Sequence, residues 1–506
     1  MVALTALALL LPWLLALALG PRAARPVAER LACLAPLPAL VLALTAPDGL
    51  RLDVPWLLLG SRFALDDTGR MFLGVTALVW LLAGWYARGY LAGDPRRRAF
   101  QAFFLITQAG NLGVCLAADA ASFYFFFAAM TFAAYGLVVH TGSREAHRAG
   151  RVYLAMAVLG EAALVAGMLL AVRAAGSHHL ADLAAASPPA VAVWLLVAGF
   201  GIKAGVPLLH MWLPLAHPVA PVPASAVLSG VMLKAGLLGW LRFLPLGGAA
   251  LPEVGTTLMA AGLAAMFLGV AAGLAQRDAK VLLAYSSVSQ MGFMTLGVGA
   301  GLKAPELWPA LLPAVVLYAV HHALAKGALF LGVGVAGARG GHRLLLAGMA
   351  LPALALAGAP FSSGMWAKLE LKAALGGLPA PWEGLLAWLL PLAALATGLL
   401  MARLLILVAG REARGDAAGL ALPWWCLILA GLAAPFWLAP AGTRILAATP
   451  LAMALAPVLL AWGLAHAARR LALRGPAIPP GDLLVLLERM GNLPSCRRVK
   501  HWLGRI

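Results

Sequence analysis

The stretch GFGIKAGVPLLHMWLPLAHPVAPVPASAVLSGVMLKAGLLGW, residues 199–240, decides the fold of this chain. It places Lys203 and Lys234 inside apolar segments and interrupts the first segment with prolines. A charged side chain at bilayer depth costs at least ~2.5–3.5 kcal/mol on insertion scales. Ionisable residues inside a membrane therefore mark ion or proton pathways, and this pair favours a transporter over a passive membrane scaffold.

The composition around this stretch is typical of a membrane protein. Hydrophobic residues make up 63% of the chain and charged residues 11%, and the mean hydropathy is +0.92. Apolar runs of about 18 to 25 residues recur along the chain, and each can cross ~30 Å of hydrocarbon. We therefore expect an all-α polytopic membrane protein of about 14 to 15 transmembrane helices. The predicted spans are 2–20, 31–47, 71–92, 100–118, 121–140, 152–173, 191–215, 225–245, 254–275, 282–302, 308–336, 344–373, 384–408, 422–439 and 448–468.

The positive charge of the chain indicates a membrane topology. The formal net charge is +18, but the basic residues form short clusters between apolar runs. The positive-inside rule explains such clusters better than nucleic-acid binding does. Clusters such as 96–98 and 144–151 alternate with loops that carry Asp48, Asp53, Asp66 and Asp67. This alternation predicts an external N-terminus and a cytoplasmic basic tail. The first span lacks a basic leading region, so we expect a retained helix and not a signal peptide.

Cysteine usage gives no sign of a metal or redox centre. Cys33, Cys115, Cys426 and Cys496 form no CxxC pair and have no histidine-rich spacing around them. No iron–sulfur, haem or dinucleotide-binding motif is present. We therefore expect no cofactor and no metal, and any redox chemistry is expected to belong to partner subunits.

Two predicted spans contain helix breakers close to a lysine. Pro207 follows Lys203, and in GAPFSSGMWAKLELK, residues 358–372, Pro360 and Gly364 precede Lys368. Proline removes a backbone donor, and the freed carbonyls are tolerated in a membrane only where protein or cavity water satisfies them. Paired interrupted helices are typical of inverted-repeat transporters, while the alternative is a packing kink without a transport role.

Three blocks resemble a known family. They are KAGVPLLHMWLPLAHPVAPVPASAVLSGVMLKAG (203–236), QRDAKVLLAYSSVSQMGFM (276–294) and HHALAKGALFLGVG (321–334). Together they resemble the antiporter-like membrane subunits shared by respiratory complex I (NADH-quinone oxidoreductase), membrane-bound hydrogenases and Mrp-type Na⁺/H⁺ antiporters. The resemblance implies two inverted five-helix repeats, each with a broken helix, at 100–245 and 246–410. Helices at 1–99 and a C-terminal region at 411–506 would flank them.

The resemblance also implies a row of buried polar residues that carries protons across the middle of the membrane. By position in the blocks, this row comprises Lys203, Lys234, His322, Lys326 and Lys368. His321 and His322 point to different faces of a helix, so at most one of them is expected in the row. Lys368 has Glu370 and Lys372 nearby, so a local ion pair is the alternative for it. Asp278 and Lys280 in QRDAK are expected to anchor a helix hairpin and not to transport.

The chain departs from the family at one position. FYFFFAAMTFAAYGLVVH (123–140) has Ala128 where the family usually has a glutamate that pairs with the lysine at the position of Lys203. An opposite charge within ~4–6 Å favours a protonated lysine. Glu161, in the next span, is the other carboxylate at comparable depth in this half, and we expect it to substitute. The alternative is that Glu161 faces another helix or subunit.

The function expected from these features is proton or cation/proton translocation by one subunit of a multisubunit membrane complex in the bacterial cytoplasmic (inner) membrane. Burial disfavours the charged form of lysine, which suits it to proton exchange. Replacing Lys234 with alanine or methionine should abolish transport and leave assembly intact. The alternatives are a non-pumping scaffold paralogue, which Ala128 favours, or a subunit that energises another task such as inorganic-carbon uptake. The sequence does not assign the coupled ion, protons or Na⁺.

Overall fold

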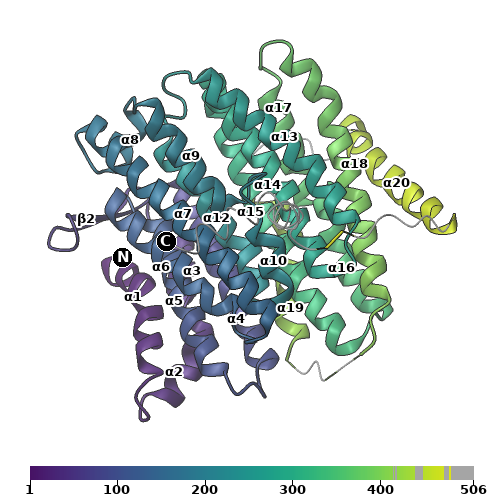
Figure 1. Ribbon diagram of the computed structural model, residues 1–506, viewed down its shortest axis with the longest axis horizontal. Coiled ribbons are helices and arrows are strands. Elements are labelled where there is room, and N and C mark those ends of the chain that lie inside the picture. The colour runs from purple at the N-terminus through teal and green to yellow at the C-terminus, as the bar shows by residue number, and fades with distance from the viewer. Residues whose placement is uncertain (414, 416–418, 439–447, 472–477, 480–506) are drawn as a thin grey trace, which may run out of the picture.

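A bundle of helices dominates the computed structural model, which describes residues 1–413, 415, 419–438, 448–471 and 478–479 (Figure 1). Within these residues, 11 helices are long and apolar enough to cross a membrane. They are Arg25–Thr45 (α2, η1 and α3), α4 (Asp67–Tyr90), α5 (Arg97–Leu116), α6 (Ala120–Val138), α7 (Arg144–Ala175), Val222–Phe243 (α11, η2 and α12), α13 (Pro252–Leu274), α14 (Ala279–Lys303), Pro305–Arg339 (η3 and α15), α18 (Trp382–Ala409) and Leu451–Arg470 within α20 (Ala448–Arg470).

Shorter helices complete the bundle. Four of them are apolar: α1 (Val2–Ala18), α9 (Ala190–Ala204), α16 (Arg343–Ala357) and α19 (Ala421–Leu438). The rest are α8 (Leu180–Ala185), α10 (Trp212–Val219) and α17 (Ser363–Leu375). Each predicted span coincides with one helix or with two or three consecutive helical segments, so the all-α polytopic prediction is confirmed. Cys496 and most of the predicted basic tail lie outside the described residues.

Helix ends follow simple capping chemistry. Asp119, Ser143 and Asp278 stand just before α6, α7 and α14, and each side chain accepts a hydrogen bond from a backbone N–H of the first turn. Glycines in the left-handed conformation end α9 (Gly205) and α16 (Gly358), where a side chain would be strained. These caps determine where the two broken spans stop.

The centre of the molecule is formed by α14 and α15 (Trp308–Arg339), whose apolar stretches are completely buried. They lie in the middle of the bundle, while α20 lies at its edge with 11% of its apolar stretch buried (Figure 1). α13 packs closely against α14 through glycines. A Cβ at Gly262 would lie 2.6 Å from the carbonyl oxygen of Gly292, so only small residues allow this approach. The polar groups described below therefore lie in a closely packed interior.

A short hairpin was not predicted. β1 (Leu50–Val54) pairs with β2 (Ser61–Leu65) in antiparallel register, and Asp53 forms ion pairs with Arg51 on its own strand and with Arg62 on the other. The backbone N–H of Arg62 donates to Asp119 Oδ2 at 2.7 Å, which ties the hairpin to the start of α6. The two arginines lower the pKa of Asp53 through their hydrogen bonds. The hairpin is thus held to the bundle by this polar contact and by the buried side chains of Phe63 and Leu65.

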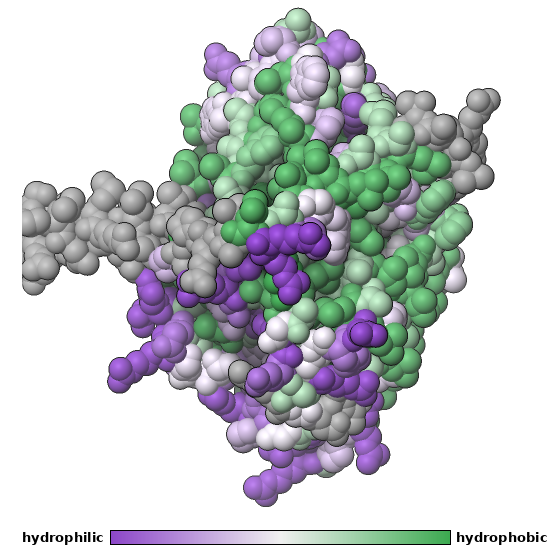
Figure 2. Space-filling model, turned by 90° about the vertical axis from the view of Figure 1, so that its right-hand side faces the viewer, coloured by the Kyte–Doolittle hydropathy of each residue, from purple (hydrophilic) through white to green (hydrophobic). Residues whose placement is uncertain are grey.

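Hydrophobic side chains cover much of the face shown in Figure 2, while hydrophilic ones form a group near its centre and further groups in its lower half. Exposed apolar residues on several helices, among them Trp388, Phe436 and Leu459, contribute to the apolar surface of the molecule. Such an apolar surface is expected of helices that face lipid.

Candidate functional site

The first broken helix stops at Ala204 and resumes at Trp212. The N–H groups of Gly205 and Val206 both donate to the carbonyl of Gly201, which closes the end of α9. Leu208, three residues after Gly205, has a positive φ of 71°. The indole of Trp212 returns to the end of α9 and donates to the carbonyl of Ile202 at 2.8 Å. The break is therefore an ordered turn with its freed carbonyls satisfied.

The second broken helix has the same local backbone. The N–H groups of Gly358 and Ala359 both donate to the carbonyl of Leu354, and Phe361, three residues after Gly358, has a φ of 62°. Prolines stand at the same position in both turns, Pro207 and Pro360. Two of the three non-glycine residues with positive φ in the described chain are thus at matching places in the two breaks. The two turns share their sequence pattern, their hydrogen bonds and their backbone conformation.

Lys203 lies at the end of α9, just before the first break, and is only 5% exposed. Its ammonium donates to Tyr153 Oη on α7 at 3.4 Å and lies 5.6 Å from the centre of the Phe127 ring on α6. A cation over an aromatic face is stabilised by the ring quadrupole. These contacts hold a buried ammonium, but neither supplies a negative charge.

Glu161 on α7 faces the same space. It lines a cavity of about 280 Å³ together with Lys203, Tyr153 and Thr131. The Glu161 side chain is 5% exposed, and the Thr131 hydroxyl on α6 is a polar group that faces its carboxylate. The charges of Glu161 and Lys203 interact across the cavity. Among the described residues, the ion pairs with nitrogen and oxygen atoms within 4 Å do not include this pair. The structure therefore brings together the two residues that the sequence suggested as partners.

Ala128 occupies the α6 face opposite Glu161. On the same helix, Thr131 lines the Glu161 cavity and Tyr124 interacts electrostatically with Glu161. Positions 124, 128 and 131 share one face of a helix because they are spaced by three and four residues. A carboxylate at position 128 would thus approach the region that the carboxylate of Glu161 occupies from α7.

Lys234 lies at the centre of the bundle and is 2% exposed. It follows η2 (Leu228–Met232), a π-helical turn between α11 (Val222–Val227) and α12 (Leu233–Phe243). Single π-turns occur frequently at functional sites. In this turn the backbone carbonyl of Ser229 accepts a hydrogen bond from Lys234 Nζ at 2.8 Å. The turn thus provides an acceptor for the ammonium.

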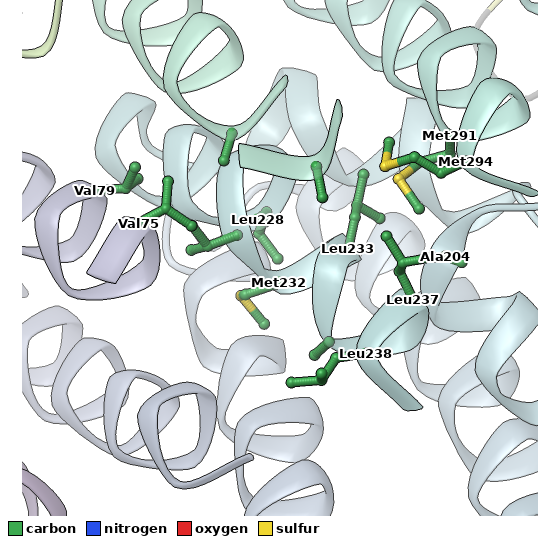
Figure 3. Close-up of a cluster of buried hydrophobic side chains, with 14 of the residues drawn as sticks. Val75, Val79, Ala204, Leu228, Met232, Leu233, Leu237, Leu238, Met291 and Met294 are labelled. Carbon is green, nitrogen blue, oxygen red and sulfur yellow. The ribbon is translucent and has the colours of Figure 1, made fainter. Parts of the chain in front are cut away.

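The surroundings of this turn are apolar. Val75 and Val79 on α4 lie on one side of it, and Met291 and Met294 on α14 lie on the other (Figure 3). All four side chains are buried. An ammonium in such surroundings cannot reach water by extending its side chain, so Lys234 must be served by internal polar groups.

Two serines connect Lys234 to Lys326 on α15. Ser229 Oγ and Ser287 Oγ, the latter on α14, are 2.7 Å apart. Ser287 Oγ donates to the carbonyl of Leu283 at 3.0 Å, and Lys326 Nζ donates to the same carbonyl at 2.9 Å. The two ammonium groups therefore bind backbone carbonyls on either side of a pair of hydrogen-bonded serine hydroxyls. Sequence reasoning missed both serines, although they lie inside the quoted blocks.

His321 and His322 on α15 are both completely buried. Within the described chain, neither ring nitrogen of His322 has a hydrogen-bond partner, and the ring interacts electrostatically with Lys234 and Lys326. His321 turns toward the second break, where its Nδ1 lies 2.8 Å from Ser363 Oγ. Both histidines therefore lie next to members of the predicted row.

Lys368 lies on α17, after the second break, and is half-buried. Its ammonium donates to the carbonyl of Ala357, the last residue of α16, at 3.1 Å and lies 5.5 Å from the centre of the Phe293 ring. It also lines a largely apolar cavity of about 580 Å³ between α17, α18 and α20. Within the described chain, Lys368 forms no ion pair with Glu370, so its partner is a carbonyl freed by the break.

Further polar groups support the site. Lys280 donates to the carbonyls of Pro218 and Ala220 between α10 and α11, which agrees with an anchoring role for QRDAK. Tyr318 Oη donates to Gln290 Oε1 at 2.9 Å, and the Gln290 amide donates to Thr397 Oγ1 at 3.2 Å. Because Tyr318, Gln290 and Thr397 are polar residues inside apolar stretches, the sequence could have indicated this hydrogen-bonded set. Among the described residues, no three His, Cys, Asp or Glu side chains gather as a metal site would require.

Comparison with known proteins places these residues in a family context. Residues 117–382 match the family described as "NADH:quinone oxidoreductase/Mrp antiporter, TM". The chain is 34% identical over 288 residues to NADH-quinone oxidoreductase subunit N of Desulforudis audaxviator, covering 54% of this chain and 56% of that protein. It is 34% identical over 284 residues to hydrogenase-4 component B of Escherichia coli, covering 53% and 42%. The aligned part thus spans about half the length of these relatives.

Solved structures show the same fold over a longer part of the chain. A chain of the Mrp complex from Dietzia sp. superposes with a TM-score of 0.72 at 23% identity, covering 92% of this chain and 100% of that one. A chain of the archaeal membrane-bound sulfane sulfur reductase superposes with a TM-score of 0.71 at 20% identity, covering 91% and 99%. Glu161, Lys203, Lys234, Lys326 and Lys368 all lie within the part that matches the family.

Proposed function

Because the chain belongs to the NADH:quinone oxidoreductase/Mrp antiporter transmembrane family, we propose that it moves protons across the membrane as one subunit of a multisubunit complex. The observation that carries this proposal is the set of ammonium groups buried in the bundle. Lys203, Lys234 and Lys326 are at most 5% exposed, and Lys368 is half-buried. Each buried charge costs at least ~2.5–3.5 kcal/mol in a membrane, a cost that packing alone does not require.

The row has a consistent order along the bundle. Lys203 and Glu161 face each other at the first break, and Lys368 binds a freed carbonyl at the second. Between the breaks, Lys234 and Lys326 share the serine-linked hydrogen bonds, with His322 beside them. We propose that protons pass along this row, with access from opposite sides of the membrane at the two breaks.

Charge coupling between neighbours would drive each transfer. Two unit charges ~8 Å apart interact by roughly 2 kcal/mol at an effective dielectric constant near 20. A proton that arrives on one lysine therefore favours release from the next. The carbonyls of Ser229 and Leu283 accept hydrogen bonds from the charged lysines, and the hydroxyls of Ser229 and Ser287 hydrogen-bond to each other beside them. These groups stabilise the charged lysines between transfers, while each proton passes between the ionisable side chains themselves.

We further propose that the row is built from two inverted five-helix repeats, residues 100–245 and 246–410. The matching turns of the two breaks support this division, since a shared sequence pattern and a shared backbone are expected of repeated units. Residues 1–99 and 411–506 would then flank the repeats. The two repeats differ in where the lysine lies: Lys203 comes before the first turn, and Lys368 comes after the second.

The expected setting is the bacterial cytoplasmic membrane, with an external N-terminus, a cytoplasmic tail and other membrane subunits as partners. The similarity to chains of an Mrp complex and of an archaeal respiratory complex supports membrane partners. The proposed ion is the proton, and Na⁺ in exchange for protons is the alternative. The subunit would contribute ion movement, and any electron transfer would belong to its partners.

A second candidate function is a non-pumping scaffold in the same kind of complex, and Ala128 is the observation that favours it. Without a carboxylate at position 128, Lys203 lacks the counter-charge that the family usually provides there. Glu161 in the same cavity argues against this candidate, because it places a buried carboxylate close to the buried ammonium of Lys203, which a scaffold does not require.

The proposed function is tested by measuring proton flux with a pH-sensitive dye in inverted membrane vesicles. The vesicles come from cells that produce the complete complex or the complex without this chain, and flux is recorded with and without Na⁺. We expect a proton flux that depends on this chain, and a response to Na⁺ would identify an exchanger. Equal flux in both vesicle preparations, with the other subunits assembled, would favour the scaffold.

A further inference from the structure

His321 lies at the junction between the long helix α15 and the second break. The imidazole is completely buried, and its Nδ1 lies 2.8 Å from Ser363 Oγ. Ser363 is the first residue of α17, the helix that carries Lys368. His321 therefore connects the central helix to the segment of the row beyond the break.

The imidazole fits into a space that the break leaves open. A Cβ at Gly364 would lie 2.9 Å from His321 Cε1 and would also collide with the carbonyl of Ala355. The lack of a side chain at position 364 thus makes room for both the helix contact and the ring. The other ring nitrogen, Nε2, has no hydrogen-bond partner within the described chain. A completely buried, unpaired nitrogen is unusual, and it points to a group that exchanges a proton.

The charges around His321 belong to both halves of the row. The ring interacts electrostatically with both Lys234 and Lys368, and His322 is its neighbour along α15. Tyr318 packs edge-on against it with 6.1 Å between ring centres. Lys368 hydrogen-bonds to the last residue of α16 and His321 to the first residue of α17. The two side chains therefore contact the two ends of the same break.

We propose that His321 is a relay residue that carries protons between the central lysines and Lys368, with Ser363 as the residue that positions its ring. This inference rests on the proposed function. When Ser363 Oγ accepts the Nδ1–H, Nε2 is left as a base. Nε2 takes one proton from a central ammonium, which becomes a neutral amine, and His321 becomes an imidazolium. The imidazolium then gives one proton to the neutral amine of Lys368 and returns to its neutral form.

The test is His321→Asn in the assembled complex, with proton flux measured in inverted vesicles. Asparagine can still hydrogen-bond to Ser363, but it cannot carry a proton at neutral pH. We expect at least about a tenfold loss of flux, in line with the loss of a proton-transfer group, at an unchanged amount of assembled complex. His342→Asn is the matched control, because His342 is an exposed N-cap residue of α16 and asparagine caps equally well, so flux should be unchanged.

Variants of Ser363 test whether this serine positions the ring of His321. Ser363→Ala removes the partner of Nδ1 and should slow flux, while Ser363→Thr keeps the hydroxyl and should restore it. If His321→Asn transports at the wild-type rate while Lys234→Met does not, His321 is a packing residue and the inference is wrong. If neither the wild type nor any variant transports, the proposed function itself fails. His321→Gln provides a second variant in case the asparagine protein does not assemble.

Discussion

Replacing Lys234 with methionine should abolish proton flux through this subunit while the complex still assembles. The Lys234 ammonium is 2% exposed, surrounded by apolar side chains and bound to the carbonyl of Ser229. Methionine fills a similar volume without a charge, and replacing a buried charge with a well-packed apolar group is often neutral or stabilising. Loss of flux would therefore reflect loss of the proton carrier. The measurement is the initial rate of dye response in inverted vesicles, normalised to the amount of assembled complex.

Lys303→Met is the matched control for this variant. Lys303 ends α14, is only partly buried and donates to Thr256 Oγ1 at 3.1 Å, away from the row. It should transport at the wild-type rate. Undiminished flux in Lys234→Met would exclude the central lysine from the path and would contradict the proposed row.

The second large effect is expected at the first break. Glu161→Ala should reduce flux at least about tenfold, because it removes the carboxylate that shares the Lys203 cavity. An opposite charge nearby favours the protonated form of a lysine, so Lys203 without Glu161 would seldom load a proton. The measurement is again flux per assembled complex, and Glu253→Gln in the exposed first turn of α13 is the control.

Moving the carboxylate to α6 provides a sharper version of this test. Ala128 shares a helix face with Thr131, which lines the cavity of Glu161 and Lys203. In the double variant Glu161→Ala, Ala128→Glu, the carboxylate approaches Lys203 from the opposite side, and flux should return to most of the wild-type rate. Full flux in Glu161→Ala alone would show that Lys203 works without this partner. A double variant that assembles and transports no better than Glu161→Ala would indicate a role for Glu161 other than supplying charge.

The sequence predicted most of the fold because its apolar runs are long enough to cross a membrane. Every long apolar run became a helix, and the proline–glycine turns at 205–211 and 358–362 became the two breaks. The hairpin β1–β2 was missed because its strands are only five residues each and lie between long apolar runs, although LRLDV in β1 alternates apolar and polar residues. It is held to the bundle by buried Phe63 and Leu65 and by a contact to Asp119, 57 residues from Arg62, and no local pattern reveals these long-range contacts.

The site was only partly predictable. The lysines are legible because a charge in an apolar run is rare, and Glu161 was found for the same reason. Ser229 and Ser287 are ordinary residues in helix sequences, and only the packing of α14 against the π-turn brings their hydroxyls within 2.7 Å. The π-turn itself has no sequence signature. His321 was set aside because adjacent residues face different ways on a helix, yet α15 is enclosed on every side and both faces are buried.

The most direct test of the central claim is the proton flux of a complex in which Lys203, Lys234 and Lys368 are all replaced by methionine. It is measured in inverted vesicles at an amount of assembled complex equal to that of the wild type. If this subunit moves protons along the row, the flux falls to that of vesicles without the chain. A triple variant that assembles and transports like the wild type would contradict the account and leave the subunit as a scaffold.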